Sequence, residues 1–179
     1  AIIGQSQEVV PADKLLYALR DVTATVDSIP LIASSIMSKK LASGADYIVL
    51  DVKVGSGAFM KNVDEATLLA KTMVELGRLA KKPTIATLTD MEQPLGCAVG
   101  NAIEVIEAIE TLKGQGPKDF TELCIKLTAE ILQVAKIEEN ETKAEQMVSD
   151  AIHDGRGLRK LAEMIQWQGG DREVITNYK

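Results

Sequence analysis

Two short apolar segments with a capped helix between them place the strongest constraint on the fold of this 179-residue chain. The segments DYIVLDVKV (residues 46–54) and PTIATLTD (residues 83–90) are compact and apolar, which is typical of buried strands. Between them, Asn62 and Glu65 form a capping-box pattern. The apolar residues that follow at helical spacing are Ala66, Leu69, Met73, Leu76 and Ala80. This strand–helix–strand order predicts parallel pairing of the strands and an α/β layer fold.

Helices are also predicted before and after this unit. Pro11 suits the first position of a helix and Ser28 suits an N-cap. Asn101 and Glu104 repeat the capping pattern further along the chain. The segment between the first two helices is expected to be irregular. The additional helices are predicted over residues 12–19, 28–42, 101–112, 118–136, 141–153 and 157–166.

The composition argues against several classes of function. A net charge of −6 disfavours broad nucleic-acid binding, which needs a basic face, but allows a small anionic ligand where positive charge is concentrated. No apolar run approaches the ~18 residues expected of a membrane span. Cys97 and Cys124 lack metal-ligand spacing and are expected to be reduced thiols of a cytoplasmic protein. A single histidine, His153, cannot build a histidine-rich metal site.

The segment VLDVKVGSGAF, residues 49–59, has some features of a phosphate-binding loop. Its order does not fit that motif, because Lys53 precedes the glycines, and the G-x-G-x-x-G pattern is absent as well. Glycines after a strand permit close approach of the backbone to a ligand. Ligands of open α/β sheets bind beyond the carboxyl ends of the strands, which favours a functional role. A plain tight turn is the alternative.

One face of the helix predicted for residues 28–42 combines three kinds of side chain. Ser35 and Lys39 are four residues apart and therefore share a face, with Ile32 one turn before them. Arg20 follows the preceding short helix and would approach this face if the two helices pack antiparallel. The alternative is a surface lysine and serine on an amphipathic helix.

A Pro/Gly turn in TDMEQPLGCAVGN precedes the helix predicted from Asn101. Exposed carbonyls near Leu95 and Ala98 would meet Glu107, which lies two turns into that helix. One carboxylate with several carbonyl oxygens suits a hard cation of low charge. The alternative is that Glu107 is a solvated helix residue.

Three segments of the chain resemble the pyrimidine-nucleoside and thymidine phosphorylases. They are KLLYALRDVTATVDSIPLIASSIMSKKLASGADYIVLDVKVGSGAFM, LTDMEQPLGCAVGNAIEVIEAI and DGRGLRKLAEMIQWQGGD. The likeness covers nearly the whole chain and is strongest to the broad-specificity pyrimidine-nucleoside phosphorylases of Gram-positive bacteria. It implies reversible phosphorolysis, in which inorganic phosphate attacks C1′ of a pyrimidine nucleoside and releases the base and a pentose 1-phosphate.

The resemblance also implies roles for individual residues. The base would be bound by Tyr17, Arg20, Ser35 and Lys39, with Arg20 and Lys39 also acting in catalysis. An apolar wall near the 5-position of the base would be formed by Val26, Ile32 and Phe59, the last presented by the glycine loop. Lys53 would then serve in packing or pairing. A potassium ion would be held by oxygens at Leu95, Ala98 and Glu107.

The same resemblance implies a small helical domain joined to a larger parallel-sheet α/β domain with flanking helices. Residues 1–43 would be a hinge segment and helices of the small domain, and residues 44–179 part of the large one. The full-length protein is expected to be a homodimer. The phosphate-binding segment of the family lies upstream of the matching region. We therefore expect a central fragment that carries the nucleobase half of the site and does not phosphorolyse nucleosides by itself.

Two alternatives remain open at this point. In the first alternative, the chain is a non-catalytic module. It would then only bind pyrimidine, or only pack against a partner chain that supplies the rest of the active site. A phosphoribosyltransferase of related architecture would need a pyrophosphate-binding glycine loop and acidic magnesium ligands, which KVGSGAF alone does not supply.

Overall fold

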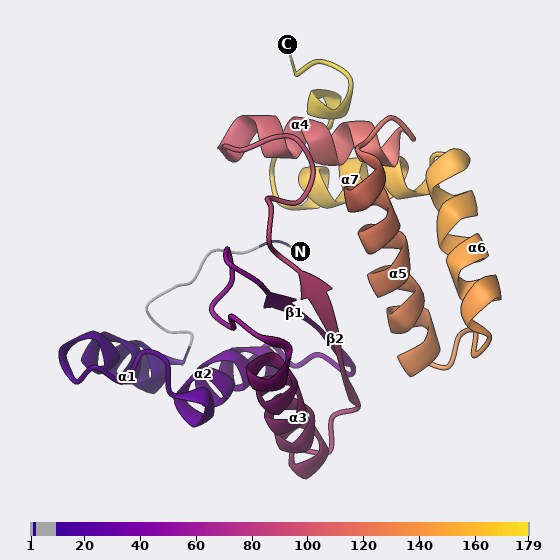
Figure 1. Cartoon of the computed structure of the whole chain (residues 1–179). Coiled ribbons are helices and arrows are strands. Elements are labelled where there is room, and N and C mark those ends of the chain that lie inside the picture. Colours follow the sequence, from indigo (N-terminus) through magenta and orange to yellow (C-terminus); the bar gives the residue numbers. More distant parts are fainter. Residues whose placement is uncertain (1, 3–9, 179) are drawn as a thin grey trace. The chain divides into compact units, whose positions relative to one another are not determined.

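The computed structural model describes Ile2 and residues 10–178, so most of the opening segment AIIGQSQEVV lies outside the described residues. The chain divides into two compact units (Figure 1). One unit comprises residues 3–93, and the other comprises residues 1–2 and 94–179. The boundary after residue 43, which was predicted between the small and the large domain of the whole protein, stays a prediction.

The parallel strand pair of the first unit confirms the strand prediction. Strand β1, Ile48–Val54, pairs in parallel with β2, Thr84–Asp90, from the Ile48–Thr84 pair to the Val54–Asp90 pair. Helix α3, Val63–Leu79, connects them, and the Asn62 side chain accepts the Glu65 N–H at 2.9 Å, as the capping pattern predicts. The predicted α/β class is therefore confirmed.

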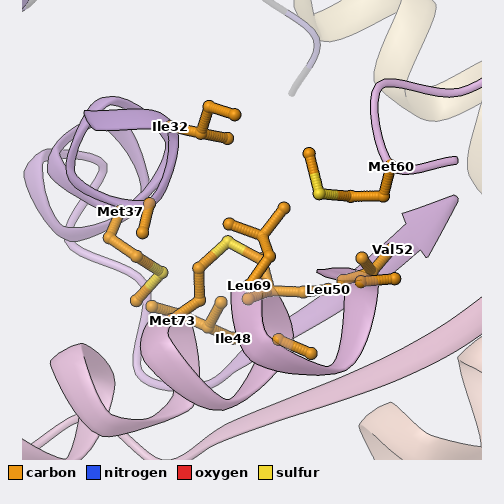
Figure 2. Close-up of a cluster of buried hydrophobic side chains, with 11 residues drawn as sticks. Ile32, Met37, Ile48, Leu50, Val52, Met60, Leu69 and Met73 are labelled. Carbon is orange, nitrogen blue, oxygen red and sulfur yellow. The ribbon is translucent and has the colours of Figure 1, made fainter. Parts of the chain in front are cut away.

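The core of this unit lies between α2 (Ile29–Ala42), β1 and α3 (Figure 2). Alternate residues of β1 are buried, as the two-residue period of a strand requires. The α3 stripe is buried through Met73 and partly at Leu76, whereas Ala80 is exposed because α3 has already ended. The fully buried cluster consists of Ile32, Ala33, Met37, Ile48, Leu50, Val52, Met60, Ala66, Leu69, Ala70 and Met73.

The first helix of the unit has an unusual distribution of polarity. Helix α1 spans Pro11–Val22, about a turn longer than expected, and it buries Asp13 and Arg20. Its large apolar residues Leu15, Leu16, Leu19 and Val22 are each more than half exposed. Asp13 and Arg20 therefore face inward, and the apolar face of α1 has no partner among the described residues.

The second unit is helical. It contains α4 (Asn101–Leu112), α5 (Lys118–Val134), α6 (Glu141–His153), α7 (Arg156–Trp167) and the short 3-10 helix η1 (Arg172–Ile175), close to the predicted ranges. Two predicted caps differ from the structure. Gly100, with a φ of 139°, is the N-cap of α4, so the predicted Asn101 cap is wrong by one residue. Ser28 does occupy the N-cap of α2, but its side chain makes no capping hydrogen bond.

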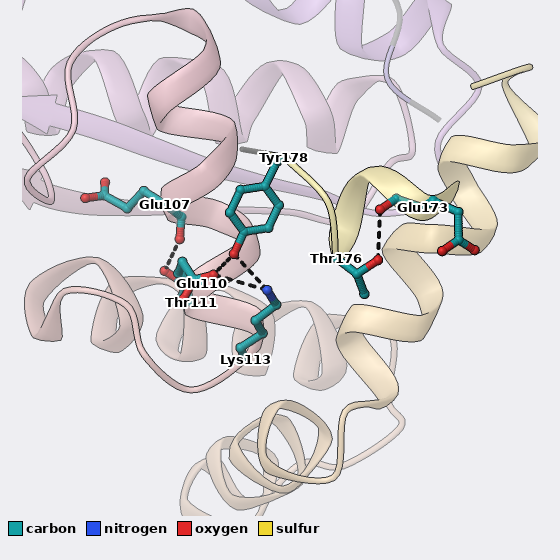
Figure 3. A network of polar contacts seen from close by, with 7 residues as sticks. All are labelled: Glu107, Glu110, Thr111, Lys113, Glu173, Thr176 and Tyr178. Atoms are coloured by element: carbon teal, nitrogen blue, oxygen red, sulfur yellow. Dashed lines mark hydrogen bonds and ion pairs between the residues drawn. The ribbon is translucent and has the colours of Figure 1, made fainter. Parts of the chain in front are cut away.

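A polar network joins the C-terminal segment of the second unit to α4 (Figure 3). The Tyr178 hydroxyl donates to Glu110, and Lys113 Nζ donates to the Tyr178 oxygen at 2.8 Å. Lys113 also forms an ion pair with Glu110 at 3.1 Å. These contacts fix residue 178 to a helix more than 60 residues earlier in the chain.

Among the described residues, every helix is too short or too polar to span a bilayer.

Candidate functional site

A small cleft in the first unit gathers most of the residues predicted to bind the base. It has a volume of about 190 Å³ and lies between α1, α2 and the loop after β1. This volume is below the roughly 300–1,000 Å³ of sites for drug-sized ligands, so the cleft suits a single heterocyclic ring. The residues that line it are Tyr17, Arg20, Ile32, Ser35, Ile36, Lys39 and Phe59.

The floor of the cleft holds the predicted serine–lysine pair. Lys39 Nζ donates to Ser35 Oγ at 2.9 Å, which the four-residue spacing on α2 permits. Ser35 is buried, and the Lys39 side chain is 34% exposed. The predicted helix face with a hydroxyl, a cation and an apolar side chain is therefore present. Because Ser35 is buried, the alternative of a serine and a lysine on an exposed surface is wrong.

The sequence analysis did not single out Asp13, which the structure places beside Lys39. The Asp13 side chain is only 9% exposed, and its carboxylate forms a short ion pair with Lys39 Nζ. Asp13 precedes Tyr17 by four residues and Arg20 by seven, so all three lie on one face of α1. That spacing is the signal that would have placed a carboxylate beside the cations.

The environment keeps Asp13 ionised. Burial acts to raise the pKa of its carboxyl group, but hydrogen bonds from Lys39 and Ser35 and the charges of Lys39 and Arg20 outweigh burial. The pKa of Asp13 therefore lies below its ordinary value. Two cations, Arg20 and Lys39, line the cleft, and the one carboxylate of Asp13 lies beside it. The positive balance suits a ligand that is electron-rich or develops negative charge.

Arg20 lines the cleft and is held by two contacts. It is 7% exposed, it donates to the carbonyl of Val26, and its guanidinium lies 5.0 Å from the centre of the Tyr17 ring. Its Nε is buried and has no hydrogen-bond partner among the described residues. A buried donor without a partner is unfavourable, so this position of Arg20 must be stabilised by its other contacts.

The three apolar residues predicted near the base occupy different positions. Ile32 and Phe59 both line the cleft, Ile32 buried and Phe59 66% exposed. Val26 is half-buried and outside the lining residues, and it contributes its carbonyl to Arg20. The structure thus brings Ile32 and Phe59 together with the polar residues, whereas Val26 lies outside the cleft and contacts Arg20 through its carbonyl.

The glycine loop after β1 packs against the protein's own backbone. A side chain at Gly55, whose φ is 134°, would place its Cβ 2.8 Å from the backbone of Met91 and Glu92. A Cβ at Gly57 would lie 2.9 Å from the Met91 carbonyl oxygen. The close approach predicted for this loop is therefore to residues 91–92. Lys53 pairs with Asp51 at 2.8 Å, which confirms its predicted role in pairing.

In the second unit, Glu107 meets the loop that was predicted to supply cation ligands. Its Oε2 accepts the N–H groups of Cys97 at 2.9 Å and Ala98 at 3.0 Å, and the Gly96 N–H donates to Asp119 at 3.0 Å. Glu107 is half-buried and bonded to this loop, so it is more than a solvated helix residue. The groups that meet its carboxylate are the N–H groups of Cys97 and Ala98, and not the predicted carbonyls of Leu95 and Ala98. Within the described part of the chain, no three His, Cys, Asp or Glu side chains cluster in a way that would hold a metal.

The sequence comparisons agree with the resemblance inferred from the motifs. Residues 1–158 match the glycosyl transferase family, a/b domain. The chain is 55% identical over 177 residues to a pyrimidine-nucleoside phosphorylase of Geobacillus stearothermophilus. It is 56% identical to proteins of that name from Staphylococcus epidermidis and Staphylococcus aureus. Each alignment covers 99% of this chain and 41% of the relative, so the chain spans less than half of their length. The match over residues 1–158 establishes that this chain belongs to the glycosyl transferase family through its a/b domain.

Proposed function

We propose that this chain carries the nucleobase-binding part of an enzyme that phosphorolyses pyrimidine nucleosides such as uridine, thymidine and deoxyuridine. Inorganic phosphate is the co-substrate: one of its oxygens bonds to C1′ while the C1′–N1 bond breaks. The products are the free base and ribose or deoxyribose 1-phosphate. The observation that carries the proposal is the cleft in which Arg20, Ser35 and Lys39 converge beside Tyr17, Ile32 and Phe59.

The polar groups of this cleft suit the edge of a pyrimidine. Uracil and thymine present the acceptors O2 and O4 on either side of the donor N3–H. Arg20 and Lys39 supply donors, and Ser35 supplies a hydroxyl that can accept.

The same cations would promote the reaction. When the glycosidic bond breaks, its electron pair passes to N1 of the base and spreads onto the carbonyl oxygens. Arg20 and Lys39 then bind the leaving base more strongly than they bind the intact nucleoside, which lowers the barrier. Asp13 and Val26 hold these two cations in place.

Further features of the proposed enzyme rest on its relatives and on single observations. We propose that potassium is bound by carbonyls of Leu95 and Ala98 with Glu107. The support is that Glu107 lies at this loop, where its Oε2 accepts two backbone N–H groups and its Oε1 would be the oxygen offered to the ion. We also propose a homodimer, a cytoplasmic location and no nucleic-acid partner. The exposed apolar face of α1 supports the dimer, and the net charge of −6 supports the absence of nucleic acid.

Calorimetry with uracil and an assay of uridine phosphorolysis test the proposal together. The 179-residue chain is expected to bind uracil without turning over uridine, and a protein of the relatives' full length that contains this chain is expected to do both. Binding without turnover in the longer protein would favour the non-catalytic alternative. Turnover with 5-phosphoribosyl pyrophosphate in place of phosphate would favour a phosphoribosyltransferase.

A further inference from the structure

The lysine that follows the glycine loop binds back onto the backbone of that loop. Lys61 Nζ donates to the carbonyl oxygen of Ser56 at 2.9 Å and to the carbonyl oxygen of Ala58 at 2.7 Å. Phe59, which lines the base cleft, directly follows Ala58 in the chain. Lys61 therefore holds the stretch of backbone that carries Phe59.

Backbone hydrogen bonds fix the glycines of the same loop. The Gly55 N–H donates to the Met60 carbonyl, and the Gly57 N–H donates to the Met91 carbonyl, each at 3.0 Å. These bonds use N–H groups of the loop, whereas Lys61 supplies donors to two of its carbonyls. Hydrogen bonds from a charged donor are stronger than those between neutral groups, so Lys61 is expected to add to the order of the loop.

The position of Phe59 depends on its backbone more than on packing. Its side chain is 66% exposed, and it bounds both the base cleft and a second hollow of about 340 Å³ that Lys61 also lines. A ring with so much open surface is not held by its neighbours. The direction in which it leaves the backbone therefore decides how it borders the cleft.

We propose that Lys61 is a positioning residue that holds Phe59 as a wall of the cleft and thereby favours thymine over uracil. This inference rests on the proposed function, because it assumes that the cleft binds a pyrimidine with its 5-position towards Phe59. The 5-methyl group of thymine adds apolar surface, which an aromatic wall would bury. Lys61 does not line the cleft, so it acts on the base only through Phe59.

The substitution Lys61→Met removes the ammonium group and keeps an unbranched apolar side chain. One methyl group in an enclosed apolar pocket changes affinity by about tenfold or more, and an exposed wall gives less. By calorimetry, we therefore expect the ratio of thymine affinity to uracil affinity to fall about threefold. Lys61→Arg keeps the donors and should retain most of the ratio. The control Lys71→Met changes an exposed lysine of α3 and should leave both affinities unchanged.

A double variant separates this role from a general loss of stability. The wall is absent in Phe59→Ala, so adding Lys61→Met should not change the ratio any further, and a further fall would overturn the inference. If the unaltered protein binds neither base, the proposed function and this inference are both wrong. If it binds both bases equally, or if Lys61→Met keeps the ratio or weakens both bases alike while circular dichroism shows an intact fold, only the role of Lys61 is wrong.

Discussion

The ion pair between Asp13 and Lys39 should make a measurable contribution to stability. The Asp13 side chain is 9% exposed and the Lys39 side chain 34%, so the pair is neither fully buried nor a surface pair. Two unit charges ~4 Å apart at an effective dielectric constant of about 20 interact by about 4 kcal/mol. The partial exposure of Lys39 reduces this value, and we expect a coupling free energy of about 1–3 kcal/mol.

A double-mutant cycle measures this coupling. The proteins are the unaltered chain, Asp13→Asn, Lys39→Met and the double variant, each unfolded by urea and followed by circular dichroism. Lys39→Met alone should destabilise most, because it leaves a buried carboxylate without its closest cation. The exposed pair Asp21→Asn and Lys40→Met provides a control with a coupling near zero. A coupling below about 0.5 kcal/mol at Asp13 and Lys39 would refute the reasoning.

The coupling should also depend on pH in a defined direction. The pKa of Asp13 is lower in the folded chain than in the unfolded chain, where it is about 3.9. Its stabilising contribution is therefore complete above about pH 4 and is lost as the pH falls through the folded pKa. Repeating the cycle at pH 7 and near pH 3 should show the coupling shrink at the lower pH. A coupling that grows on acidification contradicts this assignment.

Three further predictions concern other parts of the chain. Gly77→Ala should cost at least about 2 kcal/mol of unfolding free energy, because the new Cβ would lie 2.7 Å from Thr84 Cβ at the α3–β2 contact; an unchanged urea midpoint would contradict it. Phe59→Ala should weaken discrimination between uridine and thymidine by the full-length enzyme with little loss of stability, since Phe59 is 66% exposed; an unchanged preference counts against its place near the 5-position. Glu107→Gln should abolish any rise in thermal stability that potassium gives over sodium, and a variant that keeps this rise would remove Glu107 from the proposed site.

Local patterns predicted the strand–helix–strand unit because each step has a local cause. The Asn62 cap, the alternating burial of β1 and the α3 stripe follow from interactions within a few residues. The start of α4 was misplaced by one residue, because a glycine at a φ of 139° takes the N-cap beside a residue that caps well elsewhere.

The cleft was predicted in part for a similar reason. Ser35 and Lys39 share a helix face, so their contact follows from spacing alone. The position of Asp13 was not predicted, because α1 buries Asp13 and Arg20 and exposes its leucines, the reverse of an ordinary amphipathic helix. The contact of Tyr178 with Glu110 likewise depends on the packing of distant segments, which no local pattern encodes.

Titration of uracil into the protein tests the central claim most directly. The account predicts one uracil bound per chain, with binding abolished by Arg20→Ala and by Lys39→Ala while circular dichroism shows a retained fold. The control Lys40→Ala, an exposed lysine of the same helix, should bind as the unaltered chain does. No binding at millimolar uracil, or binding that survives the loss of both Arg20 and Lys39, would contradict the assignment of this cleft to a pyrimidine base.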